Sequence, residues 1–177
     1  MKDVRPTSGK VLLALFSILG DLGGQKNAAF LDLFAGTGRV GIEALNRGAS
    51  HVVMVEVLRD RARDIERAVP KEFAGTERAV VLSLELRRAI AWLTRRGLLF
   101  DVVFADPPYN DGWGASLLHT RGMEKILRHD GVLAVEHASR EALVVPPPWE
   151  VRDVRAYGET TLTFVQRNIN NPGGILS

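Results

Sequence analysis

Four consecutive residues, Asp106-Pro107-Pro108-Tyr109, carry the clearest chemical signal in the sequence. They follow the apolar run 100–105, which predicts a buried strand. Because each proline removes a backbone N–H from the ladder, a central strand has to end at this point. A carboxylate, two rigid carbonyls and an aromatic ring would then lie at the carboxyl end of a strand. In open α/β sheets, that end is where ligands bind.

These groups suit a flat base that carries an exocyclic amine. The Asp106 carboxylate and the Pro107 carbonyl can each accept one amine hydrogen, while the Tyr109 ring stacks on the base. The tetrapeptide alone is interpreted at least as well as a rigid turn, so a second motif has to decide. The expected chemistry is alkylation of an amino group on a nucleobase.

The second motif lies upstream, where the apolar strand 30–34 leads into a glycine-rich loop and a helical pattern. Glycine allows dihedral angles and close approaches that other residues do not, and the first N–H groups of a helix are unpaired. The next strand, 51–55, is followed by an acid that can accept both hydroxyls of a ribose. The pattern predicts a nucleoside-binding βαβ unit. Its expected cofactor-binding residues are Asp32, Ala35, Gly36, Thr37, Gly38 and Glu56.

The spacing Gly36-x-Gly38-x-x-Gly41 also fits the dinucleotide fingerprint, so a nicotinamide-binding oxidoreductase is one alternative. Asp32 argues against it, because a carboxylate inside the strand before the loop would repel a pyrophosphate. The same carboxylate could hold an ammonium group. S-adenosylmethionine has an ammonium group, a ribose and a sulfonium that supplies a methyl group, and it is therefore the expected cofactor.

Several of these segments together resemble one known family. The chain looks like the class I S-adenosylmethionine-dependent methyltransferases, and it is most similar to the RsmD-like family, which methylates a guanine N2 in bacterial 16S ribosomal RNA. The resemblance covers roughly residues 4–167. The matching segments are Arg5-Pro6-Thr7, 31–38, 41–49, 100–109, Leu133-Ala134-Val135-Glu136-His137, Tyr157-Gly158 and Thr160-Thr161-Leu162.

The resemblance implies an α/β class I methyltransferase (Rossmann-like) fold, with a mostly parallel seven-stranded sheet and a C-terminal antiparallel hairpin. It also implies roles for single residues. Asp106 and the carbonyl of Pro107 would orient the amine, and Tyr109 would hold a flipped-out base. Pro108 and Trp113 would complete the substrate-binding surface, although Trp113 could equally anchor the core.

The sequence departs from the family pattern in three places. The family usually opens with a basic β-hairpin before Arg-Pro-Thr, and this chain starts almost at that point, so part of the RNA-docking surface is expected to be absent. Gly9-Lys10 replace a common acid–arginine pair. Arg88 occupies the place of an Asp or Asn near the adenine, so adenine recognition would rest on backbone groups or on Glu85.

Two functions besides RNA methylation and hydride transfer stay open. A DNA adenine-N6 methyltransferase can carry the same Asp-Pro-Pro-Tyr tetrapeptide, although this chain leaves no room for a DNA target-recognition domain. A non-catalytic module could keep the nucleoside pocket and transfer no methyl group. The substrate expected from the resemblance is ribosomal RNA, and the mild net charge of +2 favours RNA within a small-subunit particle over free RNA.

Composition limits the remaining possibilities. A chain of 177 residues with 46% hydrophobic and 25% charged residues predicts one ordered domain, here 1–167, followed by a flexible tail at 168–177. The absence of cysteine excludes disulfides and fits a cytoplasmic protein. The four histidines show no metal-ligand spacing, so no metal is expected. No apolar stretch is long enough to span a bilayer.

The alternation of apolar runs and amphipathic segments predicts helices on both faces of a parallel sheet. Strands are expected at 29–34, 51–56, 79–84, 100–105, 131–136, 150–157 and 160–166, and helices at 8–20, 39–47, 58–69, 86–96 and 115–128.

Overall fold

The computed structural model describes residues 9–21, 27–108 and 113–168, with the side chains of residues 21 and 113–115 left undescribed. Its strands are β1 (Ala29–Asp32), β2 (His51–Val55), β3 (Ala79–Leu82), β4 (Phe100–Ala105), β5 (Leu127–Ala138), β6 (Trp149–Tyr157) and β7 (Thr160–Arg167). Its helices are α1 (Gly9–Asp21), α2 (Arg39–Asn46), α3 (Arg59–Ala68), α4 (Leu86–Arg95), α5 (Trp113–Leu118) and α6 (Met123–Ile126).

The strands form one seven-stranded sheet in the order β3-β2-β1-β4-β5-β7-β6. The five strands β1 to β5 pair in parallel, and β7 runs antiparallel between β5 and β6. The central strands β1, β2 and β4 are buried along nearly their whole length, which explains why their sequences are unbroken apolar runs. The predicted parallel sheet with a C-terminal antiparallel hairpin is confirmed.

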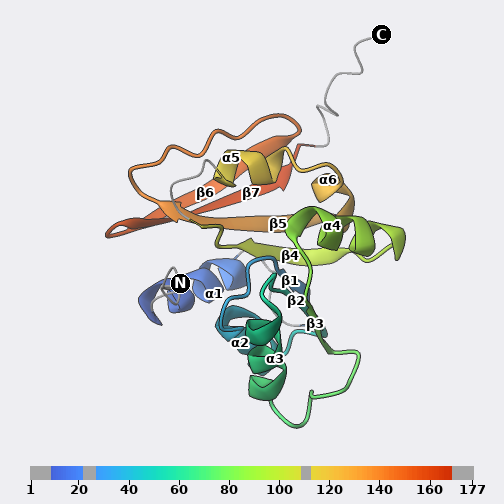
Figure 1. Cartoon of the computed structure of the whole chain (residues 1–177). Helices are drawn as coiled ribbons and strands as arrows, with labels where there is room; N and C mark the ends of the chain where they lie inside the picture. The colour runs from blue at the N-terminus through green and yellow to red at the C-terminus, as the bar shows by residue number, and fades with distance from the viewer. Residues whose placement is uncertain (1–8, 22–26, 109–112, 169–177) are drawn as a thin grey trace.

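Helices cover both faces of the sheet, and Figure 1 shows α1, α2 and α3 on one side and α4, α5 and α6 on the other. Alternate side chains of each strand enter one of two cores. Phe104 of β4 packs in the core beneath α1, α2 and α3, whereas its neighbour Val103 packs in the core beneath α4, α5 and α6. This alternation decides which face each residue at a strand end presents.

The single helix predicted over 115–128 is wrong. The structure has the two short helices α5 and α6, with Gly122 between them at a φ of 92°, a left-handed conformation that glycine adopts without strain. Strand β5 also begins earlier than predicted, because Leu127 already pairs with Phe100. The register between β4 and β5 then shifts before Val102 pairs with Val132. The apolar residues of this segment therefore serve a strand start as well as a helix.

Most other boundaries agree with the prediction to within two residues, and two of the differences matter for function. Strand β1 ends at Asp32, and β2 ends at Val55, so one acid closes its strand and Glu56 follows directly after the other. Asn168 pairs with the Pro148 carbonyl, and the rest of the predicted tail lies outside the described residues.

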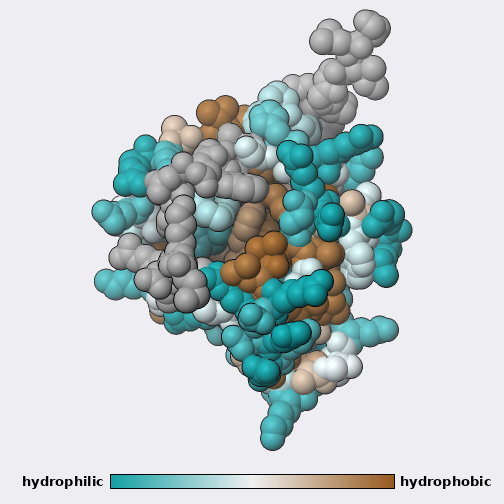
Figure 2. Space-filling model, in the orientation of Figure 1, coloured by the Kyte–Doolittle hydropathy of each residue, from teal (hydrophilic) through white to brown (hydrophobic). Residues whose placement is uncertain are grey.

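Figure 2 shows hydrophobic surface in the middle of the face drawn and hydrophilic surface around it. Among the described exposed apolar side chains, Val57 (58% exposed) and Leu58 (49%) directly follow Glu56. None of the described helices is long and apolar enough to cross a membrane.

Candidate active site

Four neighbouring strands of the sheet, β2, β1, β4 and β5, bring a carboxylate to the same edge. Each strand is parallel to the next, so their carboxyl ends lie together. The four acids are Glu56 after β2, Asp32 at the end of β1, Asp106 after β4 and Glu136 near the end of β5. The structure therefore brings together the acids predicted for cofactor binding and catalysis, and it adds a fourth.

The loop between β1 and α2 crosses this edge in a tight, hydrogen-bonded path. The Ala35 amide donates to the Val55 carbonyl at 2.9 Å, and the Gly38 amide donates to the Ala35 carbonyl at 2.6 Å. Gly36 and Gly38 have φ angles of 56° and 75°, in the left-handed region that disfavours other residues. Thr37 is exposed at the tip. The predicted glycine loop therefore follows its strand as expected.

Two of the glycines have a packing role that the sequence did not reveal. A Cβ atom on Gly38 would lie 2.7 Å from Cγ2 of Ile65, and one on Gly41 would overlap the side chain of Met54. The match to the dinucleotide fingerprint at these two positions thus reflects close packing of α2 against α3 and β2. These two glycines therefore do not require a pyrophosphate to explain them.

Glu56 is held in place by two backbone N–H groups. Its Oε2 accepts a hydrogen bond from Gly36 at 3.0 Å, and its Oε1 accepts one from Leu58 at 2.9 Å. The side chain is buried, so these bonds fix the carboxylate against the glycine loop. Each oxygen keeps a further lone pair, and a ribose hydroxyl can use it.

Asp32 is the most deeply buried of the four acids, with 1% of its surface exposed. Its Oδ2 accepts a hydrogen bond from the Gly41 amide at 3.2 Å, whereas its Oδ1 has no hydrogen-bond partner among the described residues. The pKa of Asp32 is raised to about 7, mainly by burial; the Gly41 and Phe34 amides lower it, and the charge of Glu56 raises it. A cationic ligand would relieve this arrangement, which is the fit expected for an ammonium group.

Asp106 stands half-buried directly after β4, and it is followed by the buried Pro107 and the exposed Pro108. The pKa of Asp106 is raised to about 8, mainly by burial and in addition by the negative charges of Glu136 and Asp32. Neither proline has a backbone N–H group, so the backbone of Pro107 and Pro108 offers hydrogen-bond acceptors and no donor. The role of this strand end toward a substrate amine stays a prediction.

Glu136 was quoted in the family motif but not assigned to the site, and the structure places it there. It is 3% exposed, and its charge acts on Asp106. The available signal was an acid at the end of an apolar run, without the two prolines that mark Asp106. His137 points to the other face, where its Nε2 lies 2.9 Å from the Thr163 hydroxyl.

Several predicted residues receive no structural test. Tyr109 and the Arg5-Pro6-Thr7 segment lie outside the described residues, and Trp113 is described only as the first residue of α5. Glu85, a suggested adenine contact, accepts a hydrogen bond from the Arg88 amide at 3.2 Å and caps α4. Their roles toward a ligand remain predictions.

The described residues contain no group of three or more His, Asp or Glu side chains that could hold a metal ion.

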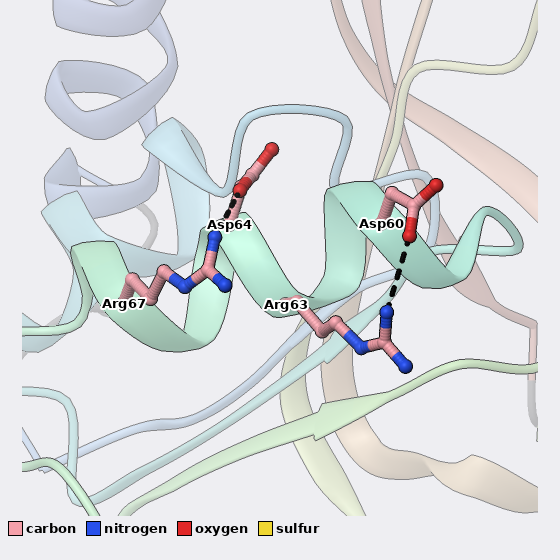
Figure 3. Close-up of polar contacts among 4 residues, drawn as sticks. All are labelled: Asp60, Arg63, Asp64 and Arg67. Atoms are coloured by element: carbon pink, nitrogen blue, oxygen red, sulfur yellow. Dashed lines mark hydrogen bonds and ion pairs between the residues drawn. The ribbon is translucent and has the colours of Figure 1, made fainter.

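Two of the four arginines on α3 form ion pairs within the helix. Figure 3 shows Arg63 bound to Asp60 and Arg67 bound to Asp64, at 3.3 Å and 3.1 Å. All four side chains are largely exposed, so these pairs belong to the solvated surface. Each pair is locally neutral, so Arg63 and Arg67 offer little positive charge to a phosphate backbone.

The strand order is that of the class I methyltransferase fold. The chain adds a glycine loop after β1, an acid after β2 and Asp-Pro-Pro after β4. Solved structures share it. A methyltransferase-like protein of Escherichia coli superimposes with a TM-score of 0.74 at 27% identity, covering 94% of this chain and 89% of that one. A hypothetical protein from Thermus thermophilus gives 0.76 at 28% identity, covering 94% and 90%.

The chain belongs to the family described as "Conserved hypothetical protein 95", which matches residues 1–166, and the predicted RsmD-like resemblance is confirmed. One relative, provisionally named rRNA methyltransferase YlbH, of Bacillus subtilis (strain 168), is 35% identical over 138 residues, covering 76% of this chain and 72% of its own. Ribosomal RNA small subunit methyltransferase D of Escherichia coli (strain K12) is 27% identical over 165 residues, covering 93% and 80%.

Proposed function

We propose that this protein is a cytoplasmic S-adenosylmethionine-dependent methyltransferase that modifies guanine N2 of 16S ribosomal RNA. The observation that carries the cofactor is the buried Asp32, whose Oδ1 has no partner among the described residues, beside the acids Glu56 and Asp106. This negative edge favours a cationic ligand and disfavours the pyrophosphate of a nicotinamide cofactor. The relatives named as ribosomal RNA methyltransferases support the substrate.

Within this proposal, each residue of the edge has one task. Asp32 holds the ammonium group of the cofactor, Glu56 accepts its ribose hydroxyls, and the loop 35–38 passes beneath it. The bound cofactor supplies an electrophilic methyl group on a positively charged sulfur. Val57 and Leu58 provide an apolar surface beside Glu56 on which the adenine ring can lie.

Asp106 and the carbonyl of Pro107 orient the amine of the target base. Each accepts one N–H, which directs the nitrogen lone pair toward the methyl group, and Asp106 can then accept the proton that the amine loses. Much of the rate enhancement would come from this positioning. A base that is stacked inside an RNA helix is out of reach of the site, so the base has to flip out. Tyr109 would then stack on it.

Ribosomal RNA within a small-subunit particle is the proposed form of the substrate. The net charge of the chain is only +2, and the α3 arginines Arg63 and Arg67 are neutralised by their own helix. Such a protein binds the phosphate backbone weakly through charge alone. A folded particle would add contacts through shape, which is how proteins recognise much of RNA.

One assay tests the substrate. Tritiated methyl transfer is measured on small-subunit particles from cells lacking the protein, on the same RNA without proteins, and on adenine-containing duplex DNA. We expect the particles to be labelled fastest and the methyl group to be found on guanine N2. Preferred labelling of the DNA would favour an adenine-N6 methyltransferase. Equal labelling of free RNA and particles would reject the small-subunit particle as the preferred form of the substrate.

Binding measurements separate a methyltransferase from an oxidoreductase and from a non-catalytic module. Calorimetric titration with S-adenosylhomocysteine should give saturable binding, whereas NAD should give none. Binding of NAD in place of S-adenosylhomocysteine would support an oxidoreductase. Binding of S-adenosylmethionine without transfer to any of the three nucleic acids would support a non-catalytic module.

A further inference from the structure

Asp106 and Glu136 lie side by side at the edge of the sheet. Strands β4 and β5 are in register through the pairs Phe104 with Ala134 and Ala105 with Val135. One residue further along, Asp106 is therefore level with Glu136, on strands that lie about 5 Å apart. The side chains of Asp106 and Glu136 also belong to the same face of the sheet. Phe104 and Ala134, two residues earlier on each strand, both pack in the core beneath α1, α2 and α3.

The surroundings of this pair contain more negative charge. Asp32 on β1 is registered with Phe104, two residues before Asp106, and its charge acts on Asp106. Glu56 after β2 extends the row. On β7 the residue opposite Glu136 is the buried Leu162, and His137 faces away toward Thr163.

Helix α1, which covers this face, contributes apolar side chains to the core, and its Lys10 is exposed at the outer end. No ion pair joins Asp106 to a cation in the part of the chain that the structure describes.

We propose that Glu136 is a positioning residue that acts through Asp106, so that the two carboxylates share one proton in the empty protein and release it to solvent when the cationic cofactor binds. This inference rests on the proposed function. Two like charges at this spacing cannot both ionise easily, and a nearby positive charge removes the obstacle. Asp106 then becomes the carboxylate that accepts the N–H of the amine. Cofactor binding would therefore prepare the base-binding group before the RNA arrives.

Buried Asp32 supplies an independent indication that a cation belongs here. Its Oδ1 has no hydrogen-bond partner among the described residues, and the side chain is almost fully buried. A site made only for structural purposes would place a cation or an N–H group against that oxygen. The edge is therefore arranged for a positive ligand, and the Asp106–Glu136 pair extends it toward the substrate.

Proton release on cofactor binding tests the proposal without any RNA. The heat of S-adenosylmethionine binding is measured at about pH 8 in buffers of different ionisation enthalpy, which gives the number of protons released. At this pH a carboxyl with a pKa of about 8 is half protonated, so its ionisation releases about 0.5 proton, whereas Asp32 contributes only about 0.1. The amino group of the ligand titrates identically with every variant, so differences between variants isolate the pair.

Glu136→Gln removes the like charge and nearly preserves the shape. Asp106 should then already be ionised in the empty protein, and proton release should fall by at least half. Asp106→Asn should remove the same proton from the other side of the pair. Glu66→Gln, on an exposed position of α3, should release as many protons as the parent protein. Unchanged proton release in Glu136→Gln would overturn the proposal, whatever the result for Asp106→Asn.

The pH dependence of turnover gives a second readout. The acid limb of kcat/KM reports the free enzyme, so it should move to lower pH in Glu136→Gln by about one unit or more. A structural role would lower the rate at all pH values and leave the limb in place. Absence of S-adenosylmethionine binding would overturn both the proposed function and this inference, whereas binding with normal release in Glu136→Gln would overturn the inference alone.

Discussion

The two ends of β4 carry one carboxylate each, and they are treated in opposite ways. Asp101, near the start of the strand, forms an ion pair with Arg128 at 3.1 Å and accepts the Ala29 amide at 2.7 Å. Asp106, just past the other end, lies near Glu136 and Asp32, whose negative charges raise its pKa. The first acid is satisfied by the fold. The proposed function assigns the second to a ligand, so the comparison sets a structural carboxylate against a proposed functional one on the same strand.

Turnover should separate the two acids most strongly. Asp106→Asn should lower the methylation rate by about 10²-fold or more, because a neutral amide replaces the charged acceptor of the amine and cannot accept its proton. Asp101→Asn should change the rate by less than about twofold, since its side chain lies at the opposite edge of the sheet. Single-turnover transfer to small-subunit particles measures both. A comparable loss in the two variants would show that β4 acts through stability rather than chemistry.

The free energy of unfolding should respond in the opposite sense, with Asp106→Asn stabilising the protein and Asp101→Asn destabilising it. A raised pKa means that folded Asp106 keeps a proton that the unfolded chain loses, so the protein loses stability as pH rises from about 4 to 8. Asp106→Asn removes that loss and should raise the free energy of unfolding by at least about 1 kcal/mol at about pH 8.5, or several degrees in Tm.

Asp101→Asn should instead lower stability slightly, because it weakens a partly exposed ion pair. Thermal unfolding of the cofactor-free proteins at about pH 5 and about pH 8.5 makes the comparison. A stabilising effect of Asp106→Asn that is equal at both pH values would contradict the assigned cause.

Glu56 lies between these extremes, because it is bound by two amides and still offered to a ligand. Glu56→Ala should weaken S-adenosylhomocysteine binding roughly tenfold, the effect of losing a charged hydrogen-bond acceptor. Calorimetric titration measures the affinity. Glu66→Gln is the control, and unchanged affinity in Glu56→Ala would remove this residue from the cofactor site.

The smallest effect is expected where charges are already paired. Replacing both Arg63 and Arg67 by alanine should change the affinity for ribosomal RNA by less than about twofold and leave its salt dependence unchanged, because neither releases counterions from RNA when bound to its own helix. Filter binding at two salt concentrations tests this. A reduced salt slope would show that α3 contacts the phosphates.

The sequence predicted the strands well because a buried parallel strand is an unbroken apolar run, as in 100–105. It failed at 115–128, where apolar residues serve two short helices and the start of β5, and only the position of Gly122 hints at the break. Asp106 was found because two prolines mark it. Glu136 was not assigned, because its role depends on the register between β4 and β5, and register is not visible in one strand.

Gly41 shows what the tight packing of α2 means for protein engineering. Since any side chain there would collide with Met54, and one at Gly38 would collide with Ile65, these two glycines cannot be replaced to reshape the proposed cofactor site. Enlarged cofactor analogues would have to be accommodated elsewhere. The exposed Val57 and Leu58 offer that freedom, so libraries aimed at new alkyl donors or modified adenines should vary these two positions and keep the glycines.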